Sequence, residues 1–348
     1  MIWLTWRQLR GGALTVGALL AVLAVVLGLT GPGLADDYST TIAACSSQGG
    51  GCAGFVERFF EDNRITFLAA AAVVLVLPAL IGVFWGAPLI TRELEAGTHR
   101  LVWNQSITRT RWLAVKLVVT GLAAMTAAGL ASLAVTWWSS PVDKAAEDFP
   151  RMEPLLFAAR GIVPVGYAAF AFALGVTVGM LVRRTLPAMA ITLAVFVAAQ
   201  IAMPLLVRPH LVAPVRSTVE ITPSNVTGFV RGPDGVLLVE ATATSPDDWV
   251  LSSHVLDAAG HAVDAVEAPS SGPCAPSTAP AEEATGPEDD PQVAACLADL
   301  GRLGYRLEAT SHPAGRFWPF QWYETGIYTA LALALAGFCT WRIRRHVS

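Results

Sequence analysis

The sequence predicts an all-α polytopic membrane protein with six transmembrane helices and a small α+β extracytoplasmic domain inserted between the fifth and sixth. Composition is the first observation: 54% of the 348 residues are hydrophobic and only 14% are charged, whereas soluble domains carry about 25% charged residues. Second, several apolar runs reach the ~20 residues needed to cross a bilayer. Third, polar and apolar residues alternate between the last two runs, which is typical of strands.

Six stretches qualify as spans by their length and lack of internal charge, with Lys116 close to one end of the third. They cover residues 13–34, 65–85, 112–137, 162–182, 186–206 and 322–341. Nine tryptophans lie near span ends, where amphipathic rings prefer the headgroup zone. They are Trp3, Trp6, Trp85, Trp112, Trp137, Trp138, Trp318, Trp322 and Trp341. This belt supports the predicted boundaries.

The first span has one alternative interpretation, a cleaved signal peptide. Arg7 and Arg10 resemble its basic region, and 33–35 a cleavage site. The apolar run is longer than such a peptide needs, and Trp3 and Trp6 suit an interfacial anchor. We therefore expect a permanent first span.

Basic residues indicate the orientation. With the N-terminus inside, the inner loops hold 12 of the 23 Lys and Arg residues but only two of the 27 Asp and Glu residues. Short cytoplasmic loops carry such an excess of basic residues. We therefore expect both termini in the cytoplasm. Only two of the 23 basic residues are Lys, which indicates a GC-rich, bacterial genome and hence a bacterial plasma membrane.

Four of the five cysteines fall in segments predicted to lie outside. Cys45 and Cys52 share the first outer loop, and Cys274 and Cys296 share the large outer segment. An oxidising compartment favours two structural disulfides. Four unrelated thiols remain an alternative, as does a metal loop at Cys45 and Cys52, although no His lies nearby.

The chain divides into residues 1–206 with five spans and a cytoplasmic elbow at 91–111, an extracytoplasmic domain at 207–316, and residues 317–348. In the outer domain we expect strands at 217–230, 236–244, 249–255 and 306–310, and a helix at 291–303. The last part comprises an aromatic segment at 317–323, the sixth span and a basic tail. The aromatic segment is either an interfacial helix or a plain anchor of the last span.

We expect no catalytic, cofactor-binding or metal site in this chain. Ser252, Ser253, His254 and His261 would suit a hydrolase, but no nucleophile-elbow pattern accompanies them. The spacing of the two histidines matches no known metal site.

Inside the spans we expect no Asp, Glu or His, and Lys116 close enough to the cytoplasmic interface to snorkel. Ion-coupled transporters usually need a carboxylate or a His deep in the bilayer to carry the proton or sodium ion, so this class of transporter is disfavoured. Two GxxxG pairs, Gly82 with Gly86 and Gly175 with Gly179, predict close helix packing. Neither Lys lies in a GxxxxGK[ST] loop, so no ATPase motif is present.

The cytoplasmic segment 91–111 carries the most specific pattern. Glu93 and Glu95 are the only acids expected on that face. Gly97 weakens a helix by about 1 kcal/mol and indicates a break, and Thr98 can cap a second short helix. The product would be a helix–break–helix elbow.

This elbow resembles that of the ABC-2 type permeases, the membrane subunits of a class of bacterial ABC exporters, of actinobacterial type. Five residues occupy the positions of the family pattern: Glu93, Gly97, Thr98, Ser106 and Lys116. Gln105 replaces the usual Pro before the Ser. Six spans, inner termini and an insertion between spans five and six also fit.

The resemblance implies a permease subunit coupled to a separate cytoplasmic ABC ATPase, which would bind the ATP, and a second permease copy or paralogue. The residues expected to transmit motion are Arg92, Glu93, Glu95, Gly97, Thr98, Arg100 and Trp103. We expect membrane lipids but no nucleic acid as further partners. Apolar spans favour an amphipathic or lipid-like cargo. The alternatives are a receptor or scaffold that binds through its outer domain, and a membrane-anchored enzyme.

Overall fold

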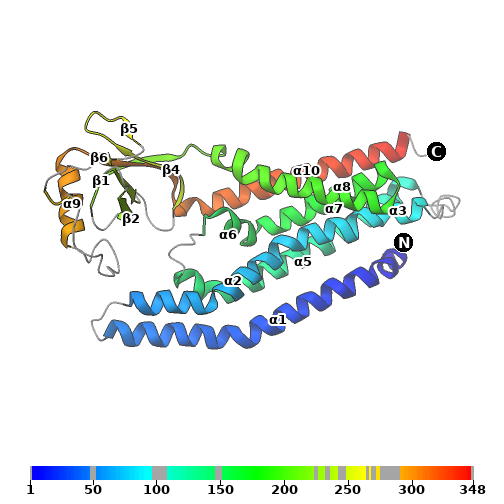
Figure 1. Ribbon diagram of the computed structural model, residues 1–348. Coiled ribbons are helices and arrows are strands. Elements are labelled where there is room, and N and C mark those ends of the chain that lie inside the picture. The colour runs from blue at the N-terminus through cyan, green and yellow to red at the C-terminus, as the bar shows by residue number, and fades with distance from the viewer. Residues whose placement is uncertain are drawn as a thin grey trace. The chain divides into compact units, whose positions relative to one another are not determined.

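The computed structural model describes residues 2–47, 52–95, 108–145, 151–222, 226–231, 236–241, 248–263, 266–267, 272–274 and 291–345. The chain forms two compact units. A helical unit comprises Met1–Leu211 and Phe317–Ser348, and a second unit comprises Val212–Arg316. Figure 1 shows their elements.

The helical unit contains six helices long and apolar enough to cross a membrane, counted over the described residues. Its elements are α1 (Ile2–Ser47), α2 (Ala53–Ile81), η1 (Gly82–Gly86), α3 (Ala87–Glu95), α5 (Arg109–Ala145), α6 (Pro154–Ala159), α7 (Val163–Val182), α8 (Thr185–Ala202), η2 (Met203–Val207), η3 (Arg208–His210) and α10 (Phe317–Arg345). The chain is thus a multi-pass membrane protein. Both the beginning of α1 and the end of α10 lie at the same end of the unit as α3 (Figure 1).

Several helices extend well past the predicted spans. At about 1.5 Å per residue, the 46 residues of α1 are more than twice as long as a bilayer core of ~30 Å requires. The part of α1 that leads to Ser47 runs alongside α2 (Figure 1). Tyr38 of α1 packs against Phe59 of α2 with ring centroids 5.3 Å apart, and a Cys45–Cys52 disulfide closes the hairpin. Hydropathy marks the membrane core and says little about where a helix ends.

Both predicted glycine pairs lie at one helix crossing. A Cβ added to Gly82 would meet the carbonyl oxygen of Ala171 on α7 at 2.8 Å. One added to Gly175 would meet the Gly82 carbonyl oxygen at 2.3 Å, and one at Gly179 the Ala87 oxygen at 2.7 Å. Glycine lets the two backbones approach closely. The crossing coincides with η1, a π-helical turn that joins α2 to α3.

The second unit is built from two antiparallel sheets and one helix. Its elements are β1 (Val215–Glu220), β2 (Val226–Arg231), β3 (Val236–Ala241), β4 (Trp249–Leu256), β5 (Ala262–Val263), β6 (Val266–Glu267), α9 (Pro291–Arg302) and β7 (Arg306–His312). The strand orders are β1-β7-β4-β5 and β2-β3-β6. The single strand expected over 217–230 is therefore wrong: β1 and β2 belong to different sheets. Pro223 stands in the sequence between them, and proline cannot donate to a strand ladder.

A disulfide holds α9 in the core of this unit. Leu297 and Leu300 of α9 are fully buried with Leu307 of β7. Cys296 on α9 pairs with Cys274, and both side chains are buried. The bond links Cys274 to α9, 22 residues later in the sequence, and holds both cysteines in the core of this unit.

Replacing Cys296 with Ser should destabilise the second unit by about 2–4 kcal/mol, because the loop between the two cysteines loses its constraint in the unfolded state. The change is measured by heating the purified protein and using the protease resistance of this unit as the readout of its unfolding. Cys45→Ser is the matched control, since it removes the other disulfide and should leave the unit resistant. Equal resistance of wild type and Cys296→Ser would contradict the prediction.

Candidate functional site

The candidate site is the end of the second span at which α3 lies, together with what α3 contacts. Helix α3 continues the rod of α2 and η1 and ends at Glu95. Thr91, Arg92, Glu93 and Glu95 of the predicted elbow therefore lie on this helix. The other predicted elbow residues lie outside the described residues: Gly97, Thr98, Arg100 and Trp103.

Glu93 binds a lysine on the third span. Its Oε1 accepts a hydrogen bond from Lys116 Nζ on α5. The Lys116 side chain is only 2% exposed, and its Nζ also lies 4.7 Å from the centroid of the Trp112 ring. The expectation that Lys116 snorkels to the interface is thus wrong, because the Glu93 carboxylate, whose side chain is 14% exposed, replaces water around the ammonium.

Glu95 binds the beginning of α8. Its Oε1 accepts the backbone N–H of Thr185 at 2.8 Å, and its Oε2 accepts the Thr185 hydroxyl at 2.7 Å. Thr185 Oγ1 also lies 3.1 Å from Thr91 Oγ1. These hydrogen bonds from Thr185 lower the pKa of Glu95, because they favour the ionised form. A carboxylate at a helix N-terminus is also favoured by the helix dipole.

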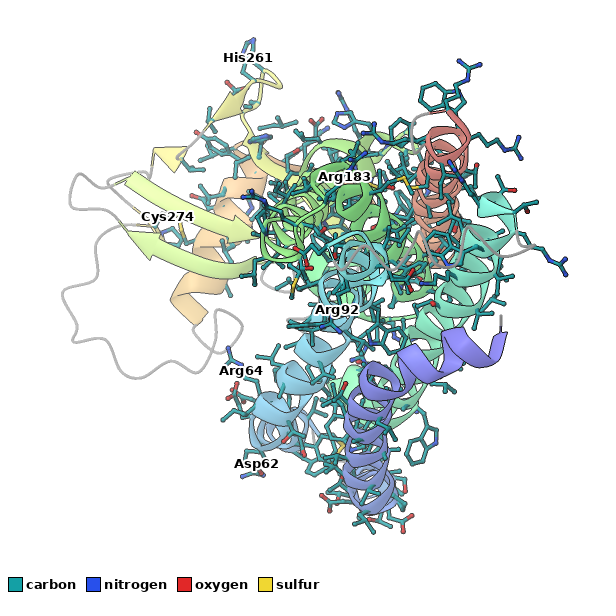
Figure 2. All side chains as sticks on the ribbon, turned by 90° about the vertical axis from the view of Figure 1, so that its right-hand side faces the viewer. Asp62, Arg64, Arg92, Arg183, His261 and Cys274 are labelled. Atoms are coloured by element: carbon teal, nitrogen blue, oxygen red, sulfur yellow. A yellow bond between two sulfur atoms is a disulfide. The ribbon has the colours of Figure 1, made fainter. Side chains whose placement is uncertain are left out.

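The two glutamates act on different neighbours because they are two residues apart. At 3.6 residues per turn, that spacing rotates the side chains by about 200° around the helix axis. Glu93 faces α5 and Glu95 faces α8, so α3 is tied to two spans at once. Arg92, between them, is exposed; Figure 2 looks onto this end of the helices and labels it together with Arg183, in the turn between α7 and α8. Arg92 is thus an exposed basic side chain on a helix that is held by α5 on one side and by α8 on the other.

Comparison with known proteins identifies the family. A family model described as ABC-2 membrane transporter related matches residues 17–208, more than half of the chain. The chain belongs to this ABC-2 family. No curated protein and no solved structure matched the chain. The predicted resemblance to ABC-2 type permeases is confirmed, and the match covers α3 and both of the spans that it contacts.

The ABC-2 chain also carries buried charges that the sequence analysis missed. Glu324 lies in α10, inside the range predicted for the last span, so the expectation of spans without Asp, Glu or His is wrong. Arg208 donates to both Glu324 oxygens, at 2.9 and 3.1 Å, and the Tyr167 hydroxyl donates to Oε1. The side chains of Arg208 and Glu324 are 1% and 0% exposed. This ion pair joins η3, which follows α8 and η2 in the fifth span, to α10.

A second buried pair lies near the start of α7. Arg160 donates to Asp143 of α5 at 3.1 Å, and burial lowers the pKa of Arg160 while Asp143 opposes this. Gln321 of α10 accepts the N–H groups of Ile162 and Val163 at 2.9 and 3.0 Å, which satisfies the first turn of α7. The sequence shows that these polar residues lie near span ends, which could have indicated buried polar contacts. It does not show which residues pair, because the partners lie up to 159 residues apart.

Among the residues that the structure describes, no three His, Cys, Asp or Glu side chains gather in a way that could hold a metal ion. His261 lies 3.6 Å from Asp257 at a turn and is exposed, as Figure 2 shows. Asp257 Oδ1 accepts the N–H groups of Ala259 and His261, which lowers the Asp257 pKa. This arrangement shapes a turn.

Proposed function

We propose that this chain is the permease subunit of a bacterial ABC exporter, driven by a separate cytoplasmic ATPase that docks on the elbow at 91–111. The observation that carries the proposal is the placement of α3. It is the inner end of the second span, and its Glu93 and Glu95 hold α5 and α8. A force applied to this helix would therefore reach three spans.

The energy source has to be a partner, because the 348 residues contain no phosphate-binding GxxxxGK[ST] motif. Membrane components of ABC transporters pair with an ATPase, and the ABC-2 family match supports this pairing here. The working unit would contain a second permease copy or a paralogue, with the cargo path between the two.

The orientation proposed here puts α3 and both termini in the cytoplasm of a bacterial cell, at the plasma membrane. Two observations support it. Arg342, Arg344 and Arg345 lie in the last turn of α10, and basic residues favour the cytoplasmic side. The beginning of α1, the end of α10 and α3 also share one end of the helical unit (Figure 1).

Purification of the tagged protein in mild detergent from cells at native expression tests this function. We expect an ABC ATPase to co-purify in a fixed ratio. Gly97→Pro should reduce the recovered ATPase about tenfold or more, which corresponds to about 1.4 kcal/mol, because proline would fix φ at the position where the sequence predicts a helix break. Quantitative mass spectrometry of the eluate measures the ratio.

Gly54→Pro is the matched control. It makes the same substitution in the first turn at the opposite end of the α2 rod, where proline is tolerated. It should leave ATPase recovery unchanged. Recovery of intact wild-type protein without any ATPase would refute the proposed function and favour a receptor or scaffold that uses the second unit for binding.

A further inference from the structure

The fifth span, the continuous helical run of α8, η2 and η3 over Thr185–His210, is held at its two ends by contacts of opposite character. At the far end from α3, Arg208 and Glu324 form a fully buried ion pair. At the near end, Glu95 is exposed to solvent where it binds Thr185. Along its length, few side chains of α8 are buried within the chain. The end near α3 is therefore the one that can be released at low cost.

We propose that Thr91, Glu95 and Thr185 form a releasable latch, which positions α8 and changes state when the partner ATPase binds ATP. This inference rests on the proposed function, because it requires an ATPase at the elbow. Thr91 and Glu95 are one helical turn apart on α3 and present their oxygens to a single residue of α8. We call these three residues the α3–α8 latch.

The start of α8 depends on the latch for its capping. The turn from α7 is only two residues long, and its Arg183 has a φ of 57°, the left-handed region that is costly for a residue with a Cβ. The N-cap residue Arg184 makes no side-chain capping bond. Glu95 supplies the missing acceptor from another helix. Moving α3 away would leave the first turn of α8 to water.

The neighbouring contact of α3 has the properties of a fixed pivot. Lys116 is buried in its pair with Glu93, and separating a buried pair leaves an uncompensated charge. Glu95 is exposed, so water can replace Thr185 as the donor to its carboxylate when the two helices separate. A push on the elbow would therefore keep α3 on α5 and break its contact with α8. The different burial of the two glutamates sets this order.

Cysteine cross-linking can follow the latch without knowledge of the cargo. Thr91 Oγ1 and Thr185 Oγ1 are 3.1 Å apart, and cysteine places its sulfur at the same position, so a small shift reaches the S–S distance of about 2.05 Å. The Thr91→Cys, Thr185→Cys double variant is purified with its ATPase. Oxidation rates are measured by mass spectrometry of the linked peptide, nucleotide-free and after trapping with ATP, Mg²⁺ and vanadate.

The matched control is Thr177→Cys alone. Thr177 Oγ1 of α7 lies 3.3 Å from Sγ of the native Cys339 of α10, so this contact joins the two helices. We expect the oxidation rate of the latch pair to differ by about threefold or more between the nucleotide-free and the trapped complex, because ATP would shift the population of the closed latch. The oxidation rate of the control pair should change less. Equal latch rates, a parallel change in both pairs, or no latch cross-link in either state would overturn the inference.

A rescue series separates the latch from a purely structural role. Thr185→Ser keeps the hydroxyl and should keep the ATP hydrolysis rate of the complex, whereas Thr185→Val should change that rate by about threefold or more with the ATPase still bound. Unchanged hydrolysis in Thr185→Val would count against the latch. Loss of the ATPase from wild type would instead refute the proposed function, so the two failures are distinguishable.

Discussion

Replacing Gly175 with Ala should destabilise the helical unit by about 3 kcal/mol or more, because overpacking of a closed contact forces the backbone to move. The added Cβ would lie 2.3 Å from the Gly82 carbonyl oxygen, 2.7 Å from the Ala87 nitrogen and 3.0 Å from the Gly86 carbonyl carbon. All three are backbone atoms, so no side chain can rotate away. We expect a lower melting temperature in detergent and a smaller monodisperse fraction in size-exclusion chromatography.

Gly337→Ala in α10 is the matched control, since nothing lies within 4 Å of the Cβ that it adds. In a helix, Ala is intrinsically favoured over Gly by about 1 kcal/mol. The control should therefore be neutral or slightly stabilising. Equal melting temperatures for Gly175→Ala and wild type would show that the crossing is looser than these distances imply.

The consequence of this crossing reaches the candidate site. The two glycine pairs meet at η1, immediately before α3 begins at Ala87, and Gly179 packs against the Ala87 oxygen. A π-helical turn often marks a functional position in a helix. Helix α7 therefore supports the second span at the point where it passes into α3, so we expect a distortion here also to weaken binding of the proposed ATPase partner.

The sequence predicted those parts of the fold that depend on local composition. Residues 162–182 were expected as a span, and α7 covers Val163–Val182, because every position in this stretch is apolar or small and the next two are arginines. A helix was expected at 291–303 because proline stands at its start, and α9 covers Pro291–Arg302.

Long-range pairing was beyond local reasoning. Nothing around Glu95 in the sequence indicates that its carboxylate accepts hydrogen bonds from Thr185, 90 residues later, and so caps α8. The strand expected over 217–230 combined two strands with different partners, since strand propensity does not specify the sheet. Glu324 was overlooked because a single carboxylate barely changes the mean hydropathy of a window, although its burial against Arg208 is the decisive property.

The second large effect is expected at the buried ion pair of Arg208 and Glu324. Replacing Glu324 with Gln should destabilise the helical unit by about 3–5 kcal/mol, because it removes the negative charge and leaves the buried Arg208 without it. Glu153 is a second carboxyl group near Arg208. Burial raises the pKa of Glu153, although Arg208 opposes this rise. Because Glu153 is therefore harder to ionise, it is a poor substitute for Glu324 as the partner of Arg208. Thermal unfolding in detergent at neutral pH measures the loss.

Two further variants separate the charge from the volume of the side chain. Glu61→Gln changes the same residue type in an exposed pair with Arg64 (3.3 Å), where a salt bridge contributes about 0–1 kcal/mol, so it should have little effect. Arg208→Met combined with Glu324→Gln should be less destabilised than Glu324→Gln alone, since no unpaired charge remains, although it loses the Arg208 contact with the Phe157 ring at 4.2 Å. If the double variant were the less stable of the two, packing around Arg208 would be what holds η3 to α10, and this end of the fifth span would lack the electrostatic anchor on which the proposed latch depends.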